Sequence, residues 1–178
     1  MELIRGLTNL RPHHRGSVVT VGGFDGLHLG HQALIGRLHA AAARLRRPTM
    51  LVSFEPMPRE YLVPQAPPAR LTTGRERWHR LKELRLDYVL LLRFGEGLRR
   101  LSGEDFAQIL ARDLQASSVV VGHDFKRRRF EQLHRHALRR SKLHLTYVCI
   151  PLGTEVDERE AVSGEVYIFV PRLFGSAI

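Results

Sequence analysis

Short runs of β-branched residues alternate along the chain with longer stretches of helical periodicity, and this alternation predicts an α/β fold. The expected architecture is a Rossmann-like parallel sheet with helices on both faces. Two further observations favour it. A glycine-rich turn follows the first β-branched run, and 178 residues suffice for one domain with a substantial core.

The elements follow in order along the chain. Strands are expected where apolar runs are bounded by turn residues, at 18–22, 49–54, 88–93, 118–122 and 144–150. Helices are expected at 30–46, 73–85, 103–115 and 130–141. The proline-rich piece from Pro56 to Pro68 is predicted to be an ordered surface loop or flap, because several X-Pro units disfavour helix.

Ligands of such sheets lie beyond the carboxyl ends of the strands. The segments expected at that edge are 22–31, 54–58 and 122–125. In the first of them, glycines let the backbone approach a ligand closely, and His28 and His31 share one face at the start of a helix. The free N–H groups and the positive dipole end of that helix favour phosphate. The segment therefore predicts a phosphate site.

A family resemblance narrows this interpretation. The segment is neither a P-loop nor a GxGxxG fingerprint, whereas HLGH at 28–31 resembles the HxGH signature of the nucleotidyltransferase superfamily. More narrowly, GGFDGLHLGHQ resembles the first motif of the FMN adenylyltransferase module of bacterial bifunctional riboflavin kinase/FAD synthetase. Further similar stretches are MELIRGLTNL, SFEPMPREYL at 53–62, PARLTTGRERWHRLKELRLDYVLLLRF at 68–94 and VVVGHDF at 119–125.

The resemblance implies transfer of AMP from ATP to FMN, which yields FAD and pyrophosphate. ATP and FMN are then the substrates, and Mg²⁺ is expected to offset phosphate charge. Catalysis would rest on alignment and charge stabilisation, because the FMN phosphate is itself the nucleophile. The implied catalytic residues are His28 and His31. The implied nucleotide-binding residues are Gly22, Gly23, Phe24, Asp25, Gly30 and Ser163, and those on the flavin or substrate side are Phe54, Pro56 and Asp124.

Several of these residues also have a purely structural interpretation. A histidine pair at a helix start is often surface or capping decoration, and Asp25 precedes a glycine in a common turn pair. Phe54 and Pro56 are also typical of a strand end and a chain breaker. Trp78, at helical spacing, is expected in or near the core rather than against a ligand.

The chain departs from the family pattern after Phe125. The family's glycine- and phenylalanine-containing loop is replaced by FKRRRFEQLHRHALRR. Its ISSTxIR-like phosphate motif is represented by Val162 and Ser163 only, and Ile168 stands at the arginine position. Isoleucine offers no bidentate phosphate contact, although Arg159 or Arg172 could substitute. We therefore expect a single nucleotidyltransferase-like domain over 1–178, atypical at 126–178 and without a riboflavin kinase domain.

Two alternatives to an active enzyme remain open. The missing serine and arginine favour a degenerate nucleotide- or flavin-binding relative with little activity. The net charge of +10 favours anionic ligands without choosing between ATP and nucleic acid, and it alone supports a basic nucleic-acid-binding protein on this scaffold. Nucleic acid is less favoured, because no aromatic interleaving accompanies the basic run.

The remaining composition bears on location and partners. One cysteine, Cys149, and no membrane-length apolar stretch are typical of a cytoplasmic protein without a membrane partner. A separate riboflavin kinase is the expected source of FMN.

Overall fold

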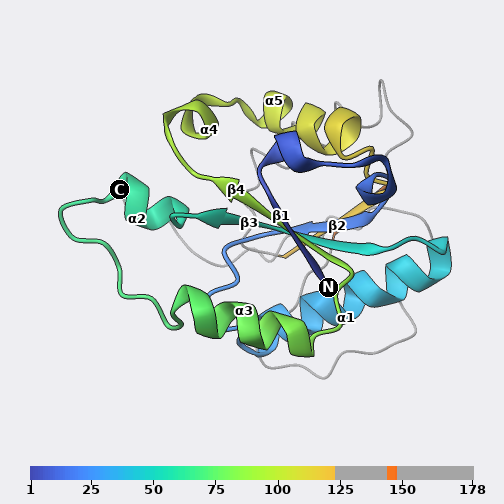
Figure 1. The fold of residues 1–178 in the computed structure, drawn as a ribbon, viewed down its shortest axis with the longest axis horizontal. Helices are drawn as coiled ribbons and strands as arrows, with labels where there is room; N and C mark the ends of the chain where they lie inside the picture. The colour runs from blue at the N-terminus through green and yellow to red at the C-terminus, as the bar shows by residue number, and fades with distance from the viewer. Residues whose placement is uncertain (123–143, 148–178) are drawn as a thin grey trace, which may run out of the picture.

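The computed structural model describes residues 1–122 and 144–147. Six parallel strands form one sheet in the order β1-β4-β3-β2-β5-β6 (Figure 1). Their bounds are β1 (Glu2–Arg5), β2 (Val18–Val21), β3 (Thr49–Glu55), β4 (Tyr88–Arg93), β5 (Ser118–Val121) and β6 (His144–Tyr147). The chain runs from β2 through β3 to β4 on one side, then returns to β5 and β6 on the other. The sheet therefore reverses its order between β2 and β5, where open parallel sheets bind ligands.

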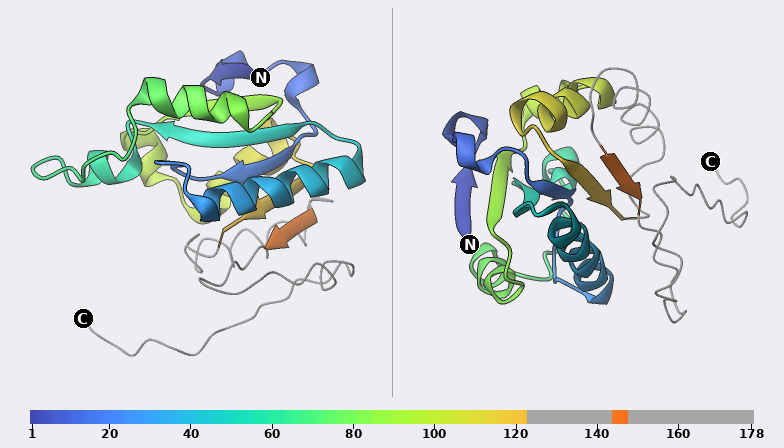
Figure 2. Two further views of the ribbon diagram at one scale, coloured as in Figure 1. Left: turned by 90° about the horizontal axis from the view of Figure 1, so that it is seen from below. Right: turned by 90° about the vertical axis from the view of Figure 1, so that its right-hand side faces the viewer.

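Helices cover both faces of the sheet, as predicted. One layer contains α1 (Leu29–Leu45) and α3 (Gly74–Glu83), and the opposite layer contains α4 (Glu96–Arg100), α5 (Gly103–Gln108) and a short π-helix, η3 (Ile109–Asp113) (Figures 1 and 2). Each layer encloses its own apolar core. Leu38 of α1 packs into one core, and Leu110 of η3 into the other, with neither side chain exposed. Burial on both faces explains why the central strands β2, β3 and β5 consist mostly of apolar residues.

The predicted strands and helices agree with the structure within two residues at most ends. The predicted strand at 49–54 continues to Glu55, and β6 occupies the first part of the predicted 144–150. The predicted helix at 103–115 is divided into α5 and η3. The predicted helix at 130–141 lies outside the described residues.

Five elements have no counterpart in the prediction. They are β1, the 3-10 turns η1 (Leu7–Asn9) and η2 (Pro12–His14), and the short helices α2 (Pro58–Leu62) and α4. The predicted loop between Pro56 and Pro68 was wrong over α2, because a proline at the first helical position loses no hydrogen bond. β1 was not predicted because it is a short strand whose one partner among the described strands is β4.

The helix α3 packs against the sheet through its apolar side. Thr73 caps it, since its hydroxyl accepts a hydrogen bond from the N–H of Glu76 at 3.2 Å. Trp78 is partly buried against the same core as Leu38, in agreement with its predicted place, and Lys82 Nζ lies 5.6 Å from its ring centre.

Within 1–122 and 144–147, no helix combines the length and apolarity needed to cross a bilayer.

Candidate active site

The glycine-rich turn at residues 22–26, called the glycine turn below, follows β2 at the carboxyl end of the strand. Val21 pairs with Val52, and the N–H of Gly22 still donates to the Val52 carbonyl at 3.1 Å. β3 then continues past this point to Glu55, so the turn runs alongside the end of a longer strand. The predicted nucleotide-binding residues Gly22 and Gly23 therefore lie at the edge where ligands of parallel sheets bind.

The two predicted catalytic histidines form one stacked pair at the start of α1. Their ring centres are 3.7 Å apart with 24° between the planes. His28 is exposed at the N-cap position, and His31 is partly buried in the first turn. Phe24 is 1% exposed and packs against His31, with the ring centres 5.0 Å apart. The structure thus brings both imidazoles to a helix end whose first-turn N–H groups favour anions.

Two glycines in this segment are required by their surroundings. Gly26 has a φ of +69°, and a Cβ there would lie 2.8 Å from Leu71 Cδ1. A Cβ at the predicted site residue Gly30 would lie 3.2 Å from Nδ1 of His28. Any larger residue at either position would push on the neighbouring side chain.

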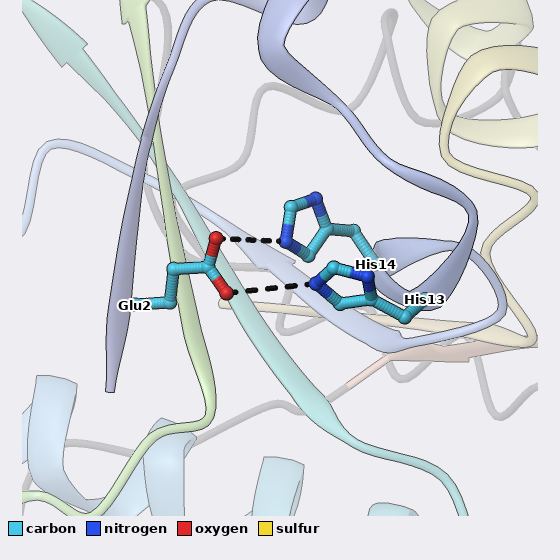
Figure 3. Close-up of side chains that lie close together, drawn as sticks. All are labelled: Glu2, His13 and His14. Carbon is cyan, nitrogen blue, oxygen red and sulfur yellow. Dashed lines mark ion pairs between the residues drawn. The ribbon is translucent and has the colours of Figure 1, made fainter.

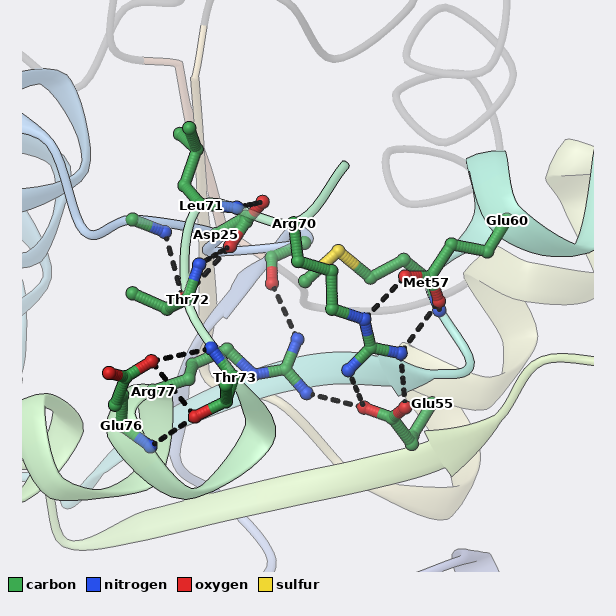
Figure 4. Close-up of polar contacts among 12 residues, drawn as sticks. Asp25, Glu55, Met57, Glu60, Arg70, Leu71, Thr72, Thr73, Glu76 and Arg77 are labelled. Atoms are coloured by element: carbon green, nitrogen blue, oxygen red, sulfur yellow. Dashed lines mark hydrogen bonds and ion pairs between the residues drawn. The ribbon is translucent and has the colours of Figure 1, made fainter. Parts of the chain in front are cut away.

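Asp25 anchors the segment that leads into α3. Its Oδ2 accepts from the N–H of Leu71 at 2.8 Å, and its Oδ1 accepts from the N–H and the hydroxyl of Thr72, both at 2.9 Å (Figure 4). Burial alone would raise the pKa of Asp25, but these hydrogen bonds outweigh it and lower the pKa below its ordinary value. Both oxygens of this predicted nucleotide-binding residue are thus engaged within the protein.

A buried guanidinium connects the glycine turn to the end of β3. Arg77 of α3 is 5% exposed, and it donates from Nη1 to the Gly23 carbonyl at 3.2 Å and from Nη2 to Glu55 Oε2 at 2.8 Å. Arg70 binds the other oxygen of Glu55 at 2.6 Å and also pairs with Glu60 of α2 (Figure 4). The hydrogen bond from Arg70 lowers the pKa of Glu60. Arg77, Glu55, Arg70 and Glu60 thus form a continuous series of ion pairs from the glycine turn to α2.

Sequence reasoning missed both arginines. Their partners lie far away along the chain, and spacing patterns carry no information about such pairs. One signal was available. Arg77 stands one helical turn before the buried Leu81, so it is a charge on the apolar side of α3.

A cluster of aromatic rings lies at the carboxyl end of β3, on the face of the sheet opposite to α3. Phe54, a predicted flavin-side residue, has ring-centre distances of 5.9 Å to Phe94 and 6.4 Å to Phe106. Tyr61 of α2 adds a fourth ring, 5.6 Å from Phe94. Pro56, also predicted on this side, follows Glu55 through a cis peptide bond at the turn into α2. Phe94 is largely buried, and the other three rings are partly exposed.

A cavity of about 390 Å³ lies between α3 and strands β1, β3 and β4. Its walls include Arg5, Glu55, Arg77 and Trp78. None of the predicted nucleotide-binding residues lines it, so it is separate from the histidine pair. The cavity adjoins this series of ion pairs at Arg77 and Glu55, which both line it.

A second histidine pair lies at the amino end of the sheet. Nε2 of His14 is 3.1 Å from Glu2 Oε1, and Nε2 of His13 is 3.6 Å from Glu2 Oε2 (Figure 3). Glu2 begins β1 and pairs with Tyr88, the first residue of β4. The N–H of Arg11 donates to Nδ1 of His14 at 3.0 Å, so the proton of the neutral ring is on Nε2 and faces Glu2. Both nitrogens of His14 are thus used within the protein, which disfavours a metal ion here.

The comparisons with known proteins identify the family. The family model described as FAD synthetase matches residues 10–164. The chain belongs to the FAD synthetase family. The resemblance expected from GGFDGLHLGHQ is thereby confirmed, and the family match extends beyond Phe125 into the atypical segment.

Bacterial relatives are also similar in sequence over about 70% of the chain. The bifunctional riboflavin kinase/FMN adenylyltransferase of Pseudomonas fluorescens is 47% identical over 126 residues, which cover 70% of this chain and 40% of that protein. The chain therefore spans about 40% of the length of this relative.

Solved structures share the fold of this FAD synthetase family member. A macrolide-efflux protein of Streptococcus pneumoniae has a TM-score of 0.68 at 24% identity, over 84% of this chain and 50% of that one. Pantoate-β-alanine ligase of Francisella tularensis has a TM-score of 0.54 at 14% identity, over 83% of this chain and 67% of that one. Both support the α/β Rossmann-like fold. Of the predicted site, Asp124 and Ser163 lie outside the described residues, as do Arg159 and Arg172.

Proposed function

We propose that this member of the FAD synthetase family transfers AMP from ATP to FMN. A phosphate oxygen of FMN attacks the α-phosphorus of ATP, the bond from that phosphorus to the bridging oxygen breaks, and pyrophosphate leaves. The observation that carries the proposal is the stacked pair of His28 and His31 beside the glycine turn, at the first turn of α1. Family membership supports the choice of ATP and FMN as substrates.

The histidine pair would act on charge rather than as a nucleophile. The negative charge that develops on the phosphates during transfer would be stabilised by N–H donors of His28 and His31 and by the first backbone N–H groups of α1. Phe24, packed against His31, would hold that ring in place. Preorganised donors of this kind cost no rearrangement at the moment of reaction.

The aromatic cluster would take the flavin. Phe54, Tyr61 and Phe106 offer partly exposed rings near the end of β3, on the layer opposite to α3. A planar isoalloxazine ring packs favourably against such rings. Asp124 and Ser163 are further proposed contacts, to substrate and to ATP phosphate respectively.

Mg²⁺ would enter as part of the ATP substrate. Among the residues that the structure describes, the two carboxylates linked to the glycine turn are Asp25 and Glu55, and both already accept N–H or guanidinium donors. Phosphate oxygens and water are the usual ligands of such an ion. A riboflavin kinase would supply the FMN. The reaction would take place in the cytoplasm, where ATP is available.

One observation favours a second candidate, a nucleotide- or flavin-binding relative with little turnover. Ile168 stands where the family's phosphate-binding arginine is expected, and Ser163 is followed by Gly164 rather than a further serine. Loss of one transition-state donor costs on the order of a hundredfold or more in rate.

Turnover distinguishes the two candidates. The purified chain is incubated with FMN, ATP and Mg²⁺, and the formation of FAD and pyrophosphate is followed. We expect FAD to form, and His28→Ala or His31→Ala to lower kcat on the order of a hundredfold. His79→Ala is the matched control, because His79 is an exposed histidine on α3, and its rate should equal that of the parent. Binding of ATP or FMN without any FAD would favour the second candidate.

A further inference from the structure

Arg77 is a charged side chain that folding has buried almost completely, at 5% exposure. Burying a charge has a desolvation cost that an apolar side chain would avoid, so an ion pair of this kind is weak evidence for a role in stability. Arg77 is instead placed between two functional segments. It donates to the Gly23 carbonyl of the glycine turn and to the Glu55 carboxylate at the end of β3.

The Gly23 carbonyl has two donors. Ser53 Oγ lies 3.1 Å from this oxygen and Arg77 Nη1 lies 3.2 Å from it. Both donors come from the α3 side of the sheet, because Arg77 projects from α3 and Ser53 lines the same cavity against that helix. The carbonyl is therefore held toward α3.

The orientation of that carbonyl decides where the next N–H points. Glu55–Pro56 is the one cis bond among the described residues, so the Gly23–Phe24 peptide is trans. The carbonyl and the N–H of a trans peptide point in opposite directions. The N–H of Phe24 consequently points away from α3 and Arg77.

We propose that Arg77 is a positioning residue for ATP. By holding the Gly23 carbonyl, it aims the Phe24 N–H at the phosphates, and Glu55 keeps the guanidinium in register. Arg70, which pairs with both Glu55 and Glu60, ties this arrangement to α2. This inference rests on the proposed function and adds a residue to its ATP site.

The test compares Arg77→Met with Arg75→Met. Arg75 is an exposed arginine two residues earlier on α3, so its variant controls for the loss of one positive charge. ATP affinity is first measured by calorimetric titration without FMN. The KM values for ATP and for FMN are then measured in separate series, with thermal unfolding of each variant alongside.

Misplacing one phosphate donor should act on ATP alone. We expect Arg77→Met to weaken ATP binding and to raise the KM for ATP on the order of tenfold, with the KM for FMN within about twofold of the parent. Partial unfolding would instead lower the apparent kcat in both series and leave both KM values in place. ATP affinity equal to that of the parent, or an equal rise in both KM values, would overturn the proposal.

Two further variants keep the test decisive if Arg77→Met does not fold. Arg77→Lys keeps the charge but offers a compact ammonium in place of the guanidinium fork, so it should raise the KM for ATP by an intermediate factor. Ser53→Ala removes the other donor to the Gly23 carbonyl and should act in the same direction. If the parent chain makes no FAD, the proposed function fails, whereas the titration of ATP still decides the role of Arg77.

Discussion

Thr72 donates two hydrogen bonds to one oxygen of Asp25, from its backbone N–H and from its hydroxyl, each at 2.9 Å. The same hydroxyl accepts the N–H of Gly26 at 3.2 Å. The glycine turn is thus held from outside by the segment that leads into α3. This contact joins residues more than forty positions apart, so the contribution of Asp25 to the stability of the fold can be measured.

Replacing Asp25 by asparagine should destabilise the protein in a pH-dependent way. Asparagine offers one acceptor oxygen, so one backbone N–H loses its partner, at a cost of about 1–2 kcal/mol near neutral pH. The folded pKa of Asp25 is lowered, so its contribution is present above the ordinary value of 3.8 and is lost as the pH falls below it. Urea unfolding between pH 7 and 3 should show the parent and variant converging at the acidic end.

The control for that experiment is Asp113→Asn, at an exposed aspartate of η3. It should stay within about 0.5 kcal/mol of the parent at every pH. A constant difference between the parent and Asp25→Asn over the whole range would contradict the assigned hydrogen bonds.

Gly26→Ala should destabilise the turn, whereas Gly36→Ala should not. Alanine at a φ of +69° costs about 1–2 kcal/mol, and its Cβ would also press on Leu71. Gly36 lies on the exposed side of α1 with no atom within 4 Å of its added Cβ, so alanine there should stabilise by about 0.5–1 kcal/mol. Thermal unfolding of the two variants should give shifts of opposite sign. Shifts of the same sign would argue against the left-handed conformation at Gly26.

Phe54→Ala should weaken flavin binding more than ATP binding. Its ring belongs to the aromatic cluster on the layer opposite to α3, and a ring stacked on a ligand contributes about 0.5–1.5 kcal/mol beyond its buried area. We expect the KM for FMN to rise roughly tenfold, equivalent to about 1.4 kcal/mol, with little change for ATP. Steady-state kinetics with each substrate varied in turn measures both. An effect confined to ATP would place the flavin elsewhere.

His14→Gln should lower stability without changing the rate per folded molecule. His14 is 1% exposed, its Nδ1 accepts the N–H of Arg11, and its Nε2 lies 3.1 Å from Glu2, so its loss leaves the Arg11 N–H without this partner and costs about 1–3 kcal/mol. It lies at the amino end of the sheet, opposite to the glycine turn. His13→Gln, at an exposed neighbour, is the control and should change stability by less than about 0.5 kcal/mol. A fall in kcat with intact folding would connect this end to the site.

Much of the fold could be predicted because burial leaves a local imprint. The run Val18–Val21 is β-branched throughout and fully buried, since both faces of its strand are covered, and that pattern is visible without any partner. β1 has no such imprint, because its four residues include charged ends and only the third is buried. Its place depends on β4, more than eighty residues later.

The candidate site divides in the same way. The pairing of His28 with His31 follows from helical spacing and was predictable. The anchoring of Asp25 by Thr72 and the bridge from Arg77 to Gly23 join residues far apart in the chain, so only the fold reveals them. The chemical groups of the site could be predicted from the sequence, whereas the contacts between distant segments could not.

The single tryptophan of the chain lies directly after Arg77 on α3, partly buried against the sheet and in the wall of the 390 Å³ cavity. Its emission therefore comes from one known place. A movement of α3 that loosens the guanidinium from the glycine turn would shift the indole toward water and change its fluorescence. The protein thus has a built-in optical reporter on the helix that contacts the glycine turn, and the proposed binding of ATP can be tested by titration without any added label.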